Sequence, residues 1–259
     1  MSNNNLKKVA LAIGLLLGAN SVFAQIIDIC PTTATKAAIH ARLKTALMAA
    51  QDVANGGFGF EMWGTVVNRD GVVCAVAHSG ADRGSQWPGS RVISAQKANT
   101  ANAFSLPGFA LATANLWEAT QPGGSLYGLQ FSNPVSTDAA YGEPSSQIGT
   151  ASDPMIGQKI GGINVFGGGL ALYDKKGVLV GAVGVSGDSS CADHNIAWRV
   201  RHDVLLDYVP AGAHATTGPA SDDNILFLGG TTGGFGHPKC GGTEHTVATT
   251  LPAIRVVTP

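Results

Sequence analysis

Apolar residues in the first part of the chain recur at the spacing of one helix face. The range 33–53 is predicted to be an amphipathic helix, and the run Asn55-Gly56-Gly57 supplies its stop signal. The predicted apolar face consists of Ile39, Leu43, Leu47 and Ala50.

Two β-hairpins with the same turn chemistry are predicted at separate places. The first has strands over 62–67 and 72–77 joined by the turn 68–71, sequence NRDG. The second has strands over 170–173 and 178–185 joined by the turn 174–177, sequence DKKG. Both turns begin with Asn or Asp and end with Gly, which is typical of a type I turn followed by a left-handed glycine.

Helices and loops are predicted for the rest of the chain. The range 91–102 is predicted to be helical, and a shorter helical stretch is expected around 111–117. Another helix is expected after 186–190, whereas 121–162 and everything past Pro210 are rich in residues typical of loops. Strands kept separate from helices in this way predict an α+β fold, an antiparallel sheet with helices packed on it.

The N-terminus has the pattern of a secretory signal peptide. Lys7 and Lys8 precede an apolar run over 9–17, and small residues follow up to Ala24. The apolar run is too short for a membrane span, which needs about 20 residues. We therefore expect residues 1–24 to be removed after Ala24 and the mature protein to be periplasmic or secreted, with no membrane span.

The charge balance argues against nucleic acid as a partner. Removal of the two lysines of the signal from a net charge of −1 leaves −3. Binding to nucleic acid would require a clustered basic face, which the sequence does not contain.

The four cysteines are expected to pair in an oxidising compartment. We favour Cys191 with Cys240, which would tie the tail to the core, and Cys30 with Cys74, which would tie the mature N-terminus to a strand. Other connectivities remain open, because four cysteines allow three.

Zinc is the alternative for one cysteine pair. Cys191 and His194 have the spacing Cys-x-x-His, and His237 and Cys240 have the spacing His-x-x-Cys, so the four could bind zinc tetrahedrally. A disulfide is favoured because thiols tend to oxidise outside the cytoplasm.

Three segments of the chain carry distinctive motifs. The strongest is 167–187, with the glycine run GGG, the strand LALY and the later run GVLVGAVGVSG, followed by Asp193 six residues on. The other two are the first hairpin with its Asp70-Gly71 turn and the stretch 95–101, sequence AQKANTA. Together these segments resemble the GlcG-like, HbpS-like family of heme-binding proteins.

This resemblance implies a fold and a ligand. Residues 25–210 would form the GlcG/HbpS-type α+β domain, of profilin-like or PAS-like shape, with a loop insertion at 121–162. Residues 211–259 would form a Gly- and Thr-rich C-terminal extension. The family implies binding of heme or another small planar tetrapyrrole outside the cytoplasm, in a homo-oligomer, with a holding, sensing, scavenging or degrading role.

Heme binding requires an apolar slot, partners for the propionates and optionally a donor atom to the iron. His78, at a strand end, is the candidate iron ligand, and an exposed histidine without a ligand is the alternative. Arg91 and Lys97, on one predicted helix, could bind the carboxylates or be solvated surface charges.

The glycine run and a serine complete the candidate ligand-binding set. Gly167, Gly168 and Gly169 could let a ligand approach the backbone, or could allow a bend into the hairpin. Ser186 lies between a strand and a helix, where backbone amides could bind an anion, although a role in the turn or cap competes with this interpretation.

The sequence favours a binding protein over an enzyme, since no convincing acid–base or nucleophile set is found. Two alternatives remain. One is a periplasmic enzyme of the same fold that acts on heme or another small molecule. The other is an oligomer-forming structural protein in which the long loop and the tail make subunit contacts.

Overall fold

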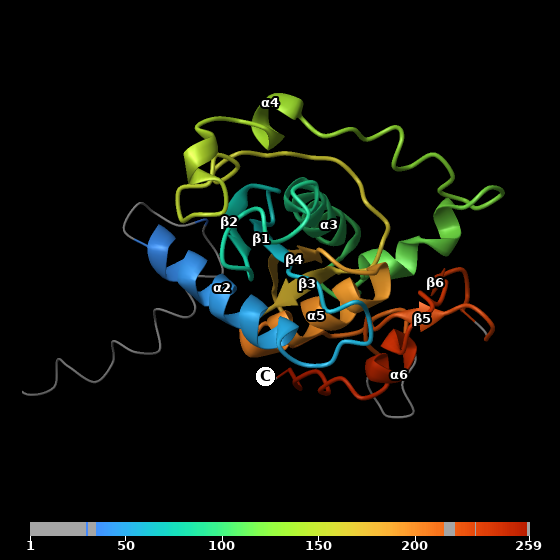
Figure 1. Ribbon diagram of the computed structural model, residues 1–259. Helices are drawn as coiled ribbons and strands as arrows, with labels where there is room; N and C mark the ends of the chain where they lie inside the picture. Colours follow the sequence, from blue (N-terminus) through green and yellow to red (C-terminus); the bar gives the residue numbers. More distant parts are fainter. Residues whose placement is uncertain (1–29, 31–34, 215–220, 231, 258–259) are drawn as a thin grey trace, which may run out of the picture.

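The protein is described by a computed structural model in which residues 30, 35–214, 221–230 and 232–257 are placed (Figure 1). The predicted signal peptide, 1–24, lies outside the described residues. Within the described ranges, no helix is long and apolar enough to cross a membrane.

A four-stranded antiparallel sheet with the strand order β2-β1-β4-β3 forms the centre of the fold. Its strands are β1 (Trp63–Asn68), β2 (Val73–His78), β3 (Gly169–Tyr173) and β4 (Leu179–Ser186). The two predicted hairpins are present, and pairing of β1 with β4 joins them. In this register Trp63 lies opposite both His78 and Ser186, so the three residues form one row at an end of the sheet.

Helices cover both faces of the sheet, which confirms the predicted α+β class. Helix α3 (Ser90–Phe104) packs on one face, and α2 (Lys36–Gln51) and α5 (Ser190–Asp203) pack on the other (Figure 1). The remaining elements are short: η1 (Thr113–Leu116), η2 (Glu118–Thr120), α4 (Thr137–Ala140), η3 (Ser145–Gln147), β5 (Leu226–Phe227), β6 (Gly236–His237) and α6 (Glu244–Ala248).

Each face of the sheet has its own hydrophobic core, because alternate residues of a strand point to opposite faces. On β1, Trp63 and Val67 belong to the core beneath α3. Gly64, between them, faces α2, and a Cβ there would lie 3.3 Å from the side chain of Leu47. The helix face predicted from the sequence is the buried face of α2.

Helix α3 packs directly on the backbone of β4. A Cβ at Gly184 would lie 1.9 Å from the carbonyl oxygen of Ser94 and 2.5 Å from the amide nitrogen of Ala98. Only glycine permits this approach, so the glycine-rich sequence of β4 sets the distance between helix and sheet.

The segment 121–162 is largely irregular but contributes to the core. Met155 and Ile160 are buried in the cluster beneath α3. The buried carboxylate of Asp153 forms an ion pair with Arg91 of α3, and Arg91 also donates to the carbonyl of Ala140 at 2.9 Å. These contacts hold the segment on the α3 side of the sheet (Figure 1).

The C-terminal segment packs against α5. Asp223 forms a buried ion pair with Arg201 of α5 at 2.7 Å, and the indole of Trp198 donates to the carbonyl of Pro252 at 2.8 Å. The structure contains two disulfides, and these join the residue pairs that the sequence favours: Cys30–Cys74 and Cys191–Cys240.

Candidate ligand-binding site

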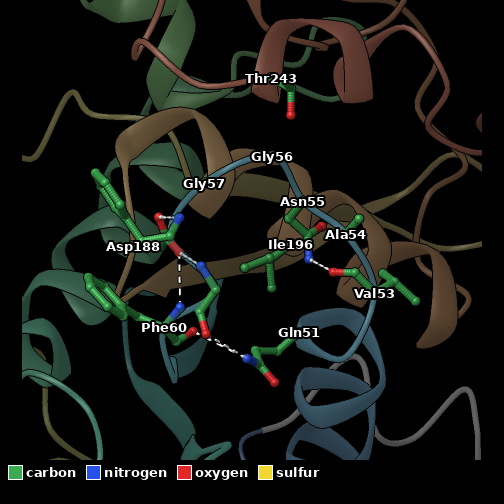
Figure 2. Close-up of a pocket in the computed structure, with 12 residues that line it drawn as sticks. Gln51, Val53, Ala54, Asn55, Gly56, Gly57, Phe60, Asp188, Ile196 and Thr243 are labelled. Atoms are coloured by element: carbon green, nitrogen blue, oxygen red, sulfur yellow. Dashed lines mark hydrogen bonds between the residues drawn. The ribbon is translucent and has the colours of Figure 1, made fainter.

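A short loop carrying two phenylalanines precedes β1 at the end of the sheet that contains the His78–Trp63–Ser186 row. The amides of Phe58, Gly59 and Phe60 donate to the carboxylate of Asp188 at 2.9, 2.8 and 3.1 Å. Asp188 follows β4, and Figure 2 shows its carboxylate facing this loop. Because charge-assisted hydrogen bonds are strong, three of them fix the loop and present its aromatic side chains.

The two phenylalanines and Trp87 form an exposed aromatic cluster. Phe58, Phe60 and Trp87 are 70%, 43% and 57% exposed. The ring centroids of Phe58 and Phe60 are 5.4 Å apart with an interplanar angle of 22°, and those of Phe60 and Trp87 are 5.4 Å apart with an angle of 58°. Apolar side chains gathered on a surface commonly mark a binding site, and aromatic faces suit planar ligands.

A cavity of about 290 Å³ opens beside the aromatic cluster. It lies between the end of α2 and the middle of α5, with the segment 53–60, Asp188 and Ile196 among its walls (Figure 2). Pockets that enclose a small molecule usually have about 300 to 1,000 Å³. The cavity is therefore slightly smaller than a pocket that encloses a whole small molecule.

His78, the candidate iron ligand, is buried under the 121–162 segment. Its Nδ1 lies 3.1 Å from the carbonyl oxygen of Gly80, so Nε2 is the atom left to act as a donor to a metal. A Cβ at Gly149 would lie 3.0 Å from that Nε2, and burial lowers the pKa of His78. Ligation of iron by His78 therefore requires the segment around Gly149 to move.

The two candidate cations are each neutralised by a buried carboxylate. Arg91 binds Asp153, with its Nε 2.8 Å from Oδ2. Lys97 is 2% exposed, and its Nζ lies 2.6 Å from Oδ2 of Asp193. The structure thus brings neither cation to the aromatic cluster.

Asp193 joins three elements at the end of β4. Besides Lys97 of α3, it accepts from the amides of Gly187 and Asp188 at 3.1 and 2.9 Å. Burial raises the pKa of Asp193 to about 6, and the neighbouring Lys97 ammonium opposes this rise. The spacing of Asp193 from the Gly-Val-Ser-Gly run thus places a carboxylate under the strand–helix junction, where Ser186 is also buried.

The glycine run 167–169 packs closely against the backbone of α5, β4 and α3. A Cβ at Gly167 would lie 2.3 Å from the carbonyl oxygen of Ser190, and one at Gly169 would lie 2.4 Å from that of Lys97. Gly168 has a φ of +112°, and its Cβ would lie 2.4 Å from the carbonyl oxygen of Val185. These contacts favour the structural interpretation of the run, since protein backbone already occupies the space beside each glycine.

A family model described as "Haem degrading protein HbpS-like" matches residues 37–201. The chain belongs to the HbpS-like family. The matched range contains the aromatic cluster, His78 and the Lys97–Asp193 pair, and it ends before the C-terminal segment. No curated protein matches the chain.

Several solved structures are similar to this HbpS-like chain. The Klebsiella pneumoniae protein ORFY is 24% identical with a TM-score of 0.43, over 64% of this chain and 88% of the other. A PduOC:heme complex is 22% identical with a TM-score of 0.43, over 68% and 95%. HbpS is 18% identical with a TM-score of 0.38, over 64% and 86%.

The candidate ligand-binding residues chosen from the sequence include neither the aromatic cluster nor Asp188. The sequence does contain a signal for the two phenylalanines, because Phe58 and Phe60 alternate with glycines in a stretch without helix or strand periodicity. Large aromatic residues in such a loop have no core to enter, and this indicates exposure. The contribution of Trp87 depends on tertiary contacts alone.

Proposed function

We propose that this HbpS-like protein binds heme, or another planar tetrapyrrole, outside the cytoplasm in a holding, sensing or scavenging role. Family membership over residues 37–201 is the observation that carries the proposal. The two disulfides support the compartment, because such bridges are typical of proteins outside the cytoplasm.

The aromatic cluster is the proposed place of contact for the tetrapyrrole ring. The ring has a large apolar face, and Phe58, Phe60 and Trp87 offer exposed aromatic faces held by a fixed loop. The adjacent cavity would take one edge of the ligand. Arg91 and Lys97 are engaged with carboxylates, so propionates directed toward solvent fit this arrangement better than propionates bound by those two cations.

Binding of the ring and ligation of the iron are separate proposals. His78 remains the predicted iron ligand, on the condition that the segment around Gly149 moves away from Nε2. Replacement of His78 by Ala separates the two. In His78→Ala, loss of the axial ligand should alter the spectrum of the bound heme, whereas contact of the ring with the aromatic cluster should preserve much of the affinity for heme.

Titration of the purified mature protein with hemin tests the proposed function. We expect a saturable shift of the Soret band with one equivalent bound per chain. A spectrum equal to that of free hemin at all protein concentrations would overturn the proposal. Non-reducing mass spectrometry of the exported protein, which should begin at Gln25 with both bridges formed, tests the compartment.

Degradation of heme is the second candidate activity, and the description of the family as haem degrading favours testing it. The heme-loaded protein is mixed with a reductant in the presence of oxygen. Loss of the Soret band beyond that of free hemin would identify an enzyme, whereas a stable band is expected for a holding protein.

Assembly into a homo-oligomer is also proposed. Tyr127, Phe131 and Tyr141 of the 121–162 segment are 63%, 83% and 65% exposed, and such side chains are enriched at protein interfaces. Light scattering coupled to size-exclusion chromatography tests this. A mass equal to one chain at all concentrations would contradict it.

A further inference from the structure

A histidine lies beside the disulfide that joins α5 to the C-terminal segment. Donor atoms of Cys191, His237 and Cys240 all lie within 4.8 Å of one another, and Nδ1 of His237 is 3.8 Å from Sγ of Cys191. Thiolate and imidazole ligands of one tetrahedral zinc ion lie about 3.6 Å apart, given zinc–ligand distances of about 2.3 and 2.0 Å. The histidine is therefore already close to the position that a shared metal would require.

We propose that Cys191, His237 and Cys240 bind a zinc ion when the Cys191–Cys240 disulfide is reduced. His194, the fourth residue of the motif in the sequence, is not part of this site. Its Nε2 lies 3.1 Å from Oδ1 of Asn224 and 3.1 Å from the amide nitrogen of Ile225. The site thus has three protein ligands and a fourth position for water, an arrangement known from zinc sites that retain an open position.

The reaction that forms the site is balanced with a dithiol as reductant. The dithiol gives two electrons and two protons and becomes a cyclic disulfide, while the Cys191–Cys240 bond breaks to give two thiols. Zinc then displaces the two thiol protons and accepts an electron pair from His237. Two thiolates cancel the charge of Zn²⁺, so the complex adds no net charge to a buried site.

Partners of His237 allow the tautomer that zinc requires. Nδ1 lies 2.7 Å from the carbonyl oxygen of Pro238, so in the disulfide form Nδ1 carries the proton and donates to it. Nε2 lies 2.8 Å from Oγ of Ser190, which can donate to Nε2 or accept from it. On zinc binding, the proton moves from Nδ1 to Nε2 and Ser190 becomes the acceptor, which orients the imidazole as outer partners of metal ligands do.

The difference in burial between the two cysteines determines which sulfur atom a reductant can reach. Cys191 and His237 are buried, whereas Cys240 is partly exposed. Attack at Sγ of Cys240 is therefore expected. The disulfide and the metal are alternative ways to hold the C-terminal segment on α5, and the redox state of the two cysteines determines which of them does so.

Metal titration of the mature protein tests the proposal. The protein is reduced with dithiothreitol, desalted without oxygen and titrated with Zn²⁺, and with Co²⁺ as a spectroscopic probe. We expect one equivalent of metal per reduced chain, a thiolate-to-cobalt charge-transfer band, and neither in the oxidised protein. Absence of metal binding by the reduced protein would overturn the proposal.

Variants identify the ligands. The double variant Cys191→Ser/Cys240→Ser should lose the metal, and Cys30→Ser/Cys74→Ser should keep it. His237→Ala should bind at least about tenfold more weakly, while the control His245→Ala, on α6, should bind as the wild type does. Equal binding by His237→Ala and His245→Ala would exclude His237 as a ligand.

Thermal unfolding of the reduced wild-type chain gives a result that needs no variant. A ligand that binds only the folded state raises the melting temperature. Zn²⁺ should therefore raise the Tm of the reduced protein, and a chelator should reverse the rise. The same Tm with and without Zn²⁺ would contradict the proposal.

Discussion

Replacement of Lys97 by Met tests whether this buried lysine serves the fold. Its side chain is 2% exposed, with Nζ 2.6 Å from Oδ2 of Asp193. Met keeps most of the apolar stem but removes the ammonium, leaving a buried carboxylate with two amide donors. Loss of one partner of a buried ion pair costs about 3 to 5 kcal/mol, and we expect the free energy of unfolding at pH 8 to fall by about that amount.

The cost should shrink as the pH falls. Burial already raises the pKa of Asp193 to about 6, and Lys97 opposes the rise, so the pKa is higher still without Lys97. A carboxyl whose pKa is higher in the folded than in the unfolded state takes up its proton first in the folded state. Its contribution to stability therefore grows as the pH falls from the folded pKa to the unfolded pKa of about 3.9. Because this gain begins at higher pH in Lys97→Met, the difference from wild type should be smaller at pH 5 than at pH 8.

Urea unfolding, followed by tryptophan fluorescence at pH 8 and pH 5, measures both effects. Lys176→Met, at an exposed position in the second hairpin turn, is the matched control and should change stability by no more than about 0.5 kcal/mol. The double variant Lys97→Met/Asp193→Asn should recover part of the loss. A cost below about 1 kcal/mol at pH 8, or one that grows toward pH 5, would refute the assigned role.

Three further predictions follow from named contacts. Cys191→Ser/Cys240→Ser opens a bridge with a sequence separation of 49 and should lower stability by about 4 kcal/mol by chain entropy; an unchanged calorimetric Tm would contradict this. Gly184→Ala places a Cβ 1.9 Å from a backbone oxygen of α3 and should lower the free energy of unfolding, measured with urea, by about 1 to 3 kcal/mol or more. The control Gly89→Ala, where no atom lies within 4 Å of the added Cβ, should cost less. Equal costs for the two variants would show that α3 and β4 separate freely. Asp188→Ala removes the acceptor of three loop amides, so it should speed proteolysis within 55–61 and weaken hemin binding. Proteolysis as slow as in the wild type would show that other contacts hold the loop.

Local sequence signals predicted the main helices and strands. Apolar spacing located α2, which buries one face, whereas β2, β3 and β4 are buried on both faces. The expected helix over 33–53 is α2 (Lys36–Gln51), and the expected helix over 91–102 is α3 (Ser90–Phe104). The hairpins followed from their turns, where Gly71 and Gly177 have φ values of +75° and +73°. The order of strands in the sheet could not be predicted from these local patterns, since pairing of β1 with β4 depends on packing between distant segments.

Roles of the candidate residues were harder to predict because distant partners decide them. Arg91 looks like a free cation in the sequence, but Asp153, 62 positions away, neutralises it. His78 lies at a strand end as expected, yet Gly149 of the irregular segment covers its Nε2. Periodicity reports which face of an element is buried, but not which loop returns to cover it.

Hemin titration of paired aromatic variants tests the central proposal most directly. Stacking on an aromatic ring contributes about 0.5 to 1.5 kcal/mol beyond buried area, so Phe58→Ala/Trp87→Ala should raise the Kd by about fivefold to more than a hundredfold. The control Phe131→Ala removes an aromatic ring that is 83% exposed elsewhere and should leave the Kd unchanged. Saturable binding that the double variant retains with wild-type affinity would contradict the aromatic cluster as the site where the ring binds.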